Sequence, residues 1–372
     1  MALQDSGRMT STQDIAEIRK LFLKLCTVIG VRVSKLQLDS ETRTMVLERN
    51  LAYIFDTLND KRTVLRLAAS KSLGLIVKRL GQELSLPVLD FLFSGLDSGS
   101  GWQRLIPSHM QSIQQRNESL EIPNLDDRHF ISIDHQLWHG STYSLAHVML
   151  AQAIPDDLLI QVCHFISAAL NFCKKSGQGT LVGEDVREAA CLCVWVLVRK
   201  YNRGPHLDSF ETQQDLATGN CLQGLVLEMI KAACLDPSNN VRRAASAALQ
   251  ETIGRHPSKV ADSVELGREL STIVDSQGVS SRQVAMLVTA LKVSRLSHTY
   301  WRMIAMELCR WRGLMSEDLK TRRLAAKSLA CIAVKTANDT KTVIQLLVDD
   351  LLLREDEGRR QGAYYICSFL RL

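Results

Sequence analysis

The sequence is poor in residues that interrupt helices. Its 372 residues include 7 prolines and 20 glycines, and aromatic residues make up only 5% of the chain. Apolar residues, in contrast, make up 46%. This balance favours long helices joined by short turns over a fold rich in β-sheet. We therefore expect an all-α protein.

The cysteines lack the spacing of a disulfide scaffold or a zinc site. Ten cysteines are spread over the whole chain, and no Cys-x-x-Cys pair occurs. Most of them lie inside apolar helical patterns, as do Cys163, Cys191, Cys193, Cys309 and Cys331. We interpret them as small buried side chains in a reducing compartment, and we expect no metal site.

Signals for membranes, secretion and nucleic acids are also missing. The longest apolar run, residues 189–198, is about half of the ~20 residues that a membrane-spanning helix needs. Residues 1–13 lack the basic and apolar parts of a signal peptide. The net charge of +5 is small and its signs are interspersed, unlike the basic stripe of a nucleic-acid-binding protein. We expect a soluble, cytoplasmic protein with no nucleic-acid partner and no membrane insertion.

Catalytic motifs are absent as well. The chain has no Gly-x-Ser-x-Gly, Walker or dinucleotide-binding motif. His135 and His139 could ligate a metal only if both were helical, but we interpret Trp138 as the start of a helix, which leaves His135 in a loop. His147 and His164 lie on apolar faces and are interpreted as packed side chains. We therefore predict no catalytic residue, no cofactor and no enzyme activity of its own.

What the chain does contain is a repeated phrase. Arg-x-Ala-Ala occurs at residues 66–69, 187–190, 242–245 and 323–326, with weaker copies at 360–363 and 138–141. Each copy opens an apolar stretch at helical spacing, and its small side chains let neighbouring helices approach closely. The intervals between copies are unequal, but most match one or two HEAT or armadillo units of ~40–47 residues. The repeats predict an α-solenoid of irregular HEAT/armadillo-type units.

The apolar spacing also predicts where the helices lie. We expect helices at 14–30, 40–58, 63–80, 86–96, 138–152, 158–173, 186–201, 212–235, 241–255, 281–293, 299–311, 318–335, 340–354 and 359–371. Pro87 should fall in the first turn of its helix, where proline is tolerated. Residues 177–179 are interpreted as a turn, because no Gly-Lys-Ser/Thr follows them.

Four segments follow from this helix pattern. Residues 1–96 are predicted to form N-terminal helical repeats, and residues 97–137, which lose the periodicity, a flexible loop insertion. Residues 138–257 should form central repeats, and residues 258–372 C-terminal repeats that end without a polar capping unit. We therefore expect the sequence to be a piece of a longer protein or a truncated gene model.

The signature helix at 241–255 predicts an inward face and an outward face. Val241, Ala245 and Thr252 share the inward face with Ala244 and Ala248, so Ala245 should be buried.

The signature arginines suggest contacts between repeats. Arg66, Arg187, Arg242 and Arg323 follow Asp60, Asp185, Asp236 and Asp318. We interpret these arginines as a ladder that joins repeats, with contact to a ligand as the alternative.

Three residues of the helix at 241–255 lie outside its inward face. Arg243, Gln250 and Arg255 are the predicted partner-binding residues, and we expect no cofactor-binding residue.

Two long segments go beyond generic repeats. Residues 186–201, with the pattern VREAAC…CVW…VRKY, and residues 242–255, RRAASAALQETIGR, resemble adjacent repeats of the tubulin-folding cofactor D family. Residues 64–74 and the Trp-His-Gly at 138–140 resemble its upstream segments, and residues 300–301, 311–313 and 323–329 resemble a fungal continuation. The resemblance covers most of residues 60–372, about the middle third of the family's usual length, and residues 258–298 depart from its pattern.

The resemblance implies a cytoplasmic, microtubule-associated scaffold that receives β-tubulin from the chaperonin. It would work with tubulin-folding cofactors C and E and an Arf-like small GTPase to assemble or disassemble αβ-tubulin and to stimulate GTP hydrolysis by tubulin. The alternative is another HEAT-repeat scaffold, of the transport-receptor or phosphatase type. The extension from Cys193 through Trp195 to Tyr201 favours the tubulin family. A third reading is that the truncated chain has lost this function.

Overall fold

The computed structural model describes residues 12–94, 134–175, 181–201, 221–274 and 281–333, together with Lys341. The chain divides into two compact units, with the boundary after Tyr201. The described part of unit 1 ends at that residue, and the described part of unit 2 begins at Cys221. Each unit is described separately below.

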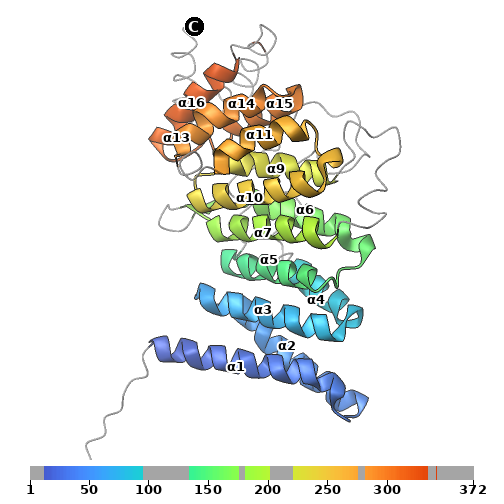
Figure 1. The fold of residues 1–372 in the computed structure, drawn as a ribbon. Coiled ribbons are helices and arrows are strands. Elements are labelled where there is room, and N and C mark those ends of the chain that lie inside the picture. The colour runs from blue at the N-terminus through green and yellow to red at the C-terminus, as the bar shows by residue number, and fades with distance from the viewer. Residues whose placement is uncertain are drawn as a thin grey trace, which may run out of the picture. The chain divides into compact units, whose positions relative to one another are not determined.

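Unit 1 consists of stacked helices in two layers. Its elements are α1 (Thr12–Arg32), η1 (Val33–Lys35), α2 (Ser40–Leu58), α3 (Thr63–Leu80), α4 (Gln82–Ser94), α5 (His135–Leu150), η4 (Asp156–Leu158), α6 (Leu159–Leu170), β1 (Lys174–Lys175), β2 (Leu181–Val182) and α7 (Glu184–Lys200). Helices α1, α3, α5 and α7 pack against one another in that order, as Figure 1 shows. Helices α2, α4 and α6 pack on α3, α5 and α7, respectively. This is the arrangement of a helical-repeat solenoid.

Unit 2 has the same type of helix packing within itself. Its elements are α9 (Cys221–Leu235), α10 (Asn239–Arg255), η5 (Pro257–Lys259), α11 (Ser263–Val274), α13 (Arg282–Val284), the π-helical turn η6 (Ala285–Thr289), α14 (Ala290–Ser294), α15 (His298–Leu308) and α16 (Leu319–Ala333). Helix α9 contacts α10 and α15, α10 contacts α11, and α15 contacts α16. The segment α13–η6–α14 corresponds to the helix predicted at 281–293.

The predictions of an all-α fold and an α-solenoid are confirmed. Within the described residues, the strands are the two-residue pair β1 and β2, in which Lys174 lies opposite Val182. The predicted helix 63–80 has the observed bounds of α3. Ala245 is fully buried, as expected from the inward face of its helix.

Four helix boundaries were predicted wrongly by three or more residues. Helix α6 ends at Leu170 rather than at Cys173. Helix α5 begins at His135 rather than Trp138, because the carboxylate of Asp134 accepts a hydrogen bond from the amide of Gln136 and caps the helix. Helix α4 begins at Gln82, so Pro87 lies inside the helix instead of in its first turn. Helix α15 ends at Leu308 because the chain turns there, with the Leu314 amide bonded to the Leu308 carbonyl.

Helix α1 packs through a different face from its most obvious apolar stripe. Leu23 and Cys26 are buried, and a Cβ placed on Gly30 would lie 2.7 Å from the Cδ1 atom of Ile76 in α3. In contrast, Ile18 and Leu21, which belong to the stripe that predicted the helix, are 59% and 60% exposed. The stripe therefore located the helix correctly but not its buried side.

Several predictions fall outside the described residues. These are most of the loop insertion at 97–137, the turn at 177–179, the start of the helix predicted at 212–235 and nearly all of the two helices predicted after residue 339. The division into four segments stays a prediction. In the described part of the chain, no helix is long and apolar enough to cross a membrane.

The burial predicted for the cysteines is confirmed with one exception. Of the nine described cysteines, six are buried and two are half-buried. Cys331, which we expected to be buried, is exposed on α16. It is followed by the buried Ile332 and Ala333, so only one side of this last turn faces inward.

Candidate partner-binding face

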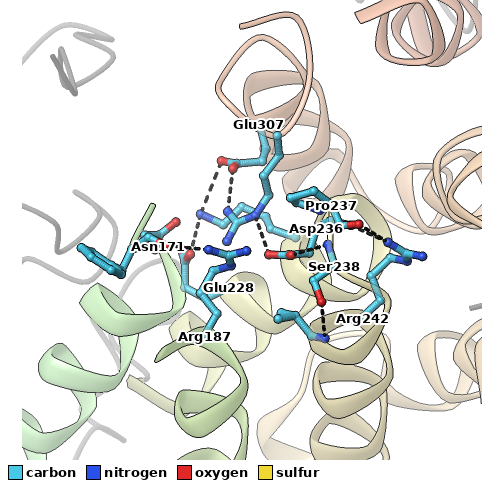
Figure 2. Close-up of polar contacts among 12 residues, drawn as sticks. Asn171, Arg187, Glu228, Asp236, Pro237, Ser238, Arg242 and Glu307 are labelled. Atoms are coloured by element: carbon cyan, nitrogen blue, oxygen red, sulfur yellow. Dashed lines mark hydrogen bonds and ion pairs between the residues drawn. The ribbon is translucent and has the colours of Figure 1, made fainter. Parts of the chain in front are cut away.

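A buried arginine holds each of three helical repeats to the turn before it. Arg66, Arg187 and Arg242 are 3%, 3% and 2% exposed. Arg66 donates to the carbonyls of residues 60 and 61 at 2.9 and 3.3 Å. Arg242 donates to the carbonyls of Asp236 and Pro237 at 2.7 and 3.0 Å, as Figure 2 shows. Arg187 donates to the carbonyl of Phe172 at 2.8 Å. The bonds of Arg66 and Arg242 satisfy carbonyl groups in the turn directly before each helix, whereas Phe172 lies just after α6, with β1 and β2 between it and α7.

The fourth signature arginine was assigned to the wrong residue. Arg323 is exposed, whereas its neighbour Arg322 donates to the carbonyls of Ser316 and Glu317 at 2.8 and 3.0 Å. These carbonyls lie six and five residues before Arg322, the same offsets as for Arg66 and Arg242. The repeat is therefore one residue out of register with the Arg-x-Ala-Ala pattern at this copy.

The predicted ladder between repeats is confirmed in unit 1. Arg66 on α3 donates from Nε to His139 Nδ1 on α5 at 2.8 Å. Its Nη2 atom lies 3.0 Å from Asp185 Oδ2 in the first turn of α7. One guanidinium group thus connects three consecutive helices of the same layer.

In unit 2, the carboxylates of Asp236 and Asp318 contact groups other than the signature arginines that were expected. The carboxylate of Asp236 faces Arg312, while Arg242 takes the carbonyl of the same residue. The carboxylate of Asp318 accepts from the amide and the hydroxyl of Thr321, which caps α16, and its Oδ2 atom lies 3.8 Å from Arg282 Nη1 on α13. An arginine and an aspartate from different helices therefore also pair here, but the arginine is Arg282. The half-buried Arg322, and not the exposed Arg323, donates to the turn carbonyl groups of this repeat.

His139 is held as a neutral acceptor in this ladder. Its pKa is lowered to about 4, mainly by burial, with Arg66 and His135 adding to the shift and the charge of Asp185 opposing it. A neutral Nδ1 atom that accepts from Arg66 is occupied and offers no lone pair to a metal. No group of three or more metal-ligating side chains occurs among the residues that the structure describes.

Close backbone packing fixes α3 against α5. Ser144 donates to Ser70 across the two helices at 3.1 Å, and Ser70 donates to the carbonyl of Gly140 at 3.1 Å. A Cβ placed on Gly74 would lie 2.6 Å from the Cβ atom of His147. The two helices therefore form a rigid base for the side chains that point outward from them.

The open side of this layer presents a mixed polar and aromatic surface. We call it the α3–α5–α7 face and define it by Lys71, Leu75, Tyr143, His147, Glu188 and Trp195. Burial lowers the pKa of His147, and the charge of Lys71 lowers it further. Burial raises the pKa of Tyr143, and the charge of Glu188 raises it further. These couplings show that side chains from neighbouring helices lie next to one another on this face.

Trp195 is the most distinctive residue of the face. The guanidinium carbon of Arg199 lies 3.9 Å from the centre of the Trp195 ring, one helical turn away on α7. This contact has cation–π geometry and restricts both side chains. Trp195 is half-buried, while Arg199 is exposed. Partly exposed tryptophan, tyrosine and arginine residues are enriched among those that dominate protein–protein binding.

The predicted partner-binding residues lie in unit 2, on α10. Arg243 and Arg255 are exposed, and Gln250 is half-buried. Arg255 forms an ion pair with Glu251 on its own helix. These observations are compatible with contact to a partner, but they do not test it, and the assignment stays a prediction.

Two of these residues occupy positions in their repeat that are equivalent to residues of the α3–α5–α7 face. Arg243 and Gln250 follow the buried Arg242 by one and eight residues, as Glu188 and Trp195 follow Arg187. Sequence reasoning found the outward positions in one repeat and did not carry them to the other. Aligning the repeats on the buried arginine would have identified Trp195.

A cluster of buried charges in unit 2 was missed entirely. Arg312 is fully buried, and its Nη1 atom donates to Glu307 Oε1 at 2.6 Å. Lys231 Nζ lies 2.6 Å from Glu228 Oε2 and 3.9 Å from Glu307 Oε2. Burial opposes the charge of Arg312, but the nearby carboxylates of Glu307 and Asp236 outweigh it and raise its pKa.

This cluster is structural rather than a binding surface. Its side chains come from α9, the turn after α9, α15 and the turn after α15, and all of them are at most 3% exposed (Figure 2 labels Glu228, Asp236 and Glu307). It ties these elements together and presents nothing to a partner. No periodic pattern in the sequence points to this cluster, because Arg312 lies in a turn.

Comparisons with known proteins support the resemblance seen in the sequence. Residues 128–261 match the family model described as tubulin-specific chaperone D-like ARM repeats. Tubulin-specific chaperone D of Dictyostelium discoideum is 23% identical over 283 residues, which cover 76% of this chain and 16% of that protein. Tubulin-folding cofactor D of Schizosaccharomyces pombe is 22% identical over 360 residues, which cover 91% of this chain and 29% of that protein.

The resemblance to tubulin-folding cofactor D, including a fungal member, is therefore confirmed. The chain spans less than a third of the length of these two relatives. The matched region contains α5, α6, α7, α9 and α10, and so includes two of the three helices of the α3–α5–α7 face.

Proposed function

We propose that this chain is a helical-repeat segment of a tubulin-folding cofactor and that it binds β-tubulin. The observation that carries the proposal is the match of residues 128–261 to the ARM repeats of tubulin-specific chaperone D-like proteins. The names of two relatives that align with most of the chain point to tubulin as the partner. A layer of stacked helices suits this role, because it offers an extended surface on which many modest contacts add up.

The finer part of the proposal concerns the complex in which the chain acts. By resemblance, it works with tubulin-folding cofactors C and E and an Arf-like small GTPase during assembly or disassembly of the αβ-tubulin heterodimer. Its contribution to GTP hydrolysis by tubulin is that of a scaffold, and the chain is not itself an enzyme. The proposed location is the cytoplasm, including microtubules.

The alternative function is that of another helical-repeat scaffold, such as a transport receptor or a phosphatase scaffold. Buried arginines and alanine-rich helices are shared by all these classes. The family match across residues 128–261 favours the tubulin cofactor, because that match is specific to one set of ARM repeats.

A binding assay separates these alternatives. The purified chain is immobilised and offered β-tubulin released from the chaperonin, assembled αβ-tubulin and a panel of nuclear-import cargoes. We expect retention of β-tubulin that survives washing at physiological salt. Retention of import cargo without tubulin would overturn the proposal.

A second assay addresses the scaffold role. GTP hydrolysis by tubulin is measured with cofactors C and E, with and without this chain. We expect no acceleration by the chain alone and a faster rate when the cofactors are also present. Acceleration by the chain alone would contradict its assignment as a scaffold without catalytic residues.

A further inference from the structure

The α3–α5–α7 face has a charge polarity along its helices. Glu184 and Asp185 lie in the first turn of α7, and Glu188 lies one turn later. Burial raises the pKa of Glu188, and the charges of Glu184 and Asp185 raise it further. Carboxylates therefore gather at the start of α7, whereas the residues just before α3, at the same end of the layer, are Lys61 and Arg62.

The opposite end of the face is basic. The last turn of α3 carries Lys78 and Arg79, and the last turn of α7 carries Arg199 and Lys200. The last turn of α5 carries His147, which adds no charge near pH 7 because its pKa is lowered by burial and by Lys71. Helices α3, α5 and α7 pack side by side. Hydrogen bonds join the first half of α3 to the first half of α5, and the end of α5 to the end of α7, so the three helices are parallel. Their last turns therefore lie at one edge of the layer.

Helix dipoles alone do not account for this edge. A cation in the last turn stabilises its own helix modestly, which explains single residues. Here the cations flank exposed apolar side chains, because Leu75 on α3 is 44% exposed and Trp195 on α7 is half-buried beneath Arg199. Exposed apolar groups gain from contact with a partner, and the surrounding cations select the charge of that partner.

We propose that the α3–α5–α7 face binds an acidic segment of a protein partner that carries apolar side chains between its carboxylates. The apolar side chains contact Leu75 and Trp195, and the carboxylates pair with Lys78 and Arg199. Glu188 at the other end repels such a segment and so fixes its direction along the face. The proposal rests on the proposed function in one respect, since it makes tubulin the protein that supplies this segment.

A set of variants tests this assignment through tubulin affinity. Trp195→Ala removes the aromatic anchor, and Lys78→Glu reverses one charge of the basic edge. We expect Trp195→Ala to weaken tubulin binding about 30-fold, the size typical of a dominant interface residue. Lys78→Glu should weaken it about fivefold at low salt and less at high salt, because salt screens exposed charges.

Matched controls lie on other surfaces of the chain. Ile160→Ala removes an apolar side chain that is 41% exposed on α6, in the other layer of unit 1. Lys320→Glu reverses an exposed charge at the start of α16 in unit 2. Both controls should bind tubulin as the wild-type chain does. Circular dichroism and melting curves check that every variant is folded.

The outcomes distinguish this inference from the proposed function. If the wild-type chain binds tubulin and all variants bind equally, the function stands and the α3–α5–α7 face is wrong. If the wild-type chain does not bind tubulin, the function fails, and a fluorescent peptide of glutamates and leucines decides the inference. Binding of that peptide, lost in Trp195→Ala and Lys78→Glu, would support the face, and no binding would overturn it.

Self-association is also checked. Light scattering on the eluted protein gives the mass of the wild-type chain and of Trp195→Ala. A dimer that Trp195→Ala dissociates would show that a second copy occupies the face, which would overturn the assignment to an acidic partner.

Discussion

In three of the repeats, one arginine donates hydrogen bonds to backbone carbonyl groups in the turn before its helix. Arg66, Arg242 and Arg322 all reach carbonyl groups five and six residues upstream. The sequence showed the alanines of this motif clearly but left the arginine of the last copy ambiguous, because Arg322 and Arg323 are adjacent. The carbonyl hydrogen bonds of the half-buried Arg322 distinguish it from the exposed Arg323, and burial depends on neighbouring helices that a short motif does not specify.

Substitution of the two adjacent arginines tests this register. Arg322→Ala removes two charged hydrogen bonds to carbonyl groups and should lower the free energy of unfolding by about 2 kcal/mol. Arg323→Ala removes an exposed side chain and should change it by less than about 0.5 kcal/mol. Urea denaturation followed by circular dichroism measures both, and an equal loss in the two variants would place the register elsewhere.

His139 gives the fold a pH dependence of known sign. Its pKa in the folded state is lowered to about 4, from the ordinary value of 6.5 for histidine. Between these two pH values the unfolded chain takes up a proton on this histidine and the folded chain does not. The contribution of His139 to the free energy of unfolding is therefore fully present above pH 6.5 and is lost as the pH falls towards 4. The loss by pH 4 should be about 3 kcal/mol, because each pKa unit corresponds to 1.36 kcal/mol.

The matched variant for this pH dependence is His139→Gln. Glutamine keeps an oxygen that can accept from Arg66 but has no nitrogen that titrates. Denaturation at pH 7 and at pH 4.5 should show a smaller loss of stability for the variant than for the wild-type chain. Parallel pH profiles would mean that His139 does not carry the effect.

At the scale of elements, most helices could be predicted from the sequence. The bounds of α3 follow from the turn at Asn59 and Asp60 and from Gly81 after its last residue, where the backbone has a positive φ of 77°. The boundary of α5 was missed because its capping residue, Asp134, lies before the apolar pattern begins. The α3–α5–α7 face was missed for a related reason, since it depends on which helices become neighbours.

Two glycines in helices should respond to alanine in opposite ways. A Cβ on Gly140 in α5 would lie 2.2 Å from the carbonyl oxygen of Leu58 in α2, so Gly140→Ala must separate the two helices. We expect a loss of about 1–3 kcal/mol in the free energy of unfolding. A Cβ on Gly254 in α10 would meet no atom within 4 Å, so Gly254→Ala should stabilise the helix by about 0.5–1 kcal/mol.

The same thermal unfolding experiment measures both glycine variants. A shift of the melting temperature downward for Gly140→Ala and upward for Gly254→Ala is expected. If Gly140→Ala melted at or above the wild-type temperature, the close approach of α2 and α5 would be incorrect.

For the whole molecule, the fold class and the family resemblance were both accessible from the sequence. Alanine and arginine at a fixed register predicted the repeats, and the longer blocks at 186–201 and 242–255 predicted the resemblance. The charge polarity of the α3–α5–α7 face was not accessible, because it arises only when the last turns of three helices lie at one edge. The buried charges around Arg312 likewise come from segments that are distant in sequence.

The central claim is that this helical-repeat chain holds tubulin on the α3–α5–α7 face. A photoreactive phenylalanine analogue placed at Trp195 tests it most directly, with the same analogue at Ile160 on α6 as the control. After mixing with β-tubulin and illumination, we expect a crosslinked product from position 195 and none from position 160. Crosslinks from position 160 alone, or from neither position while tubulin is bound, would contradict the claim.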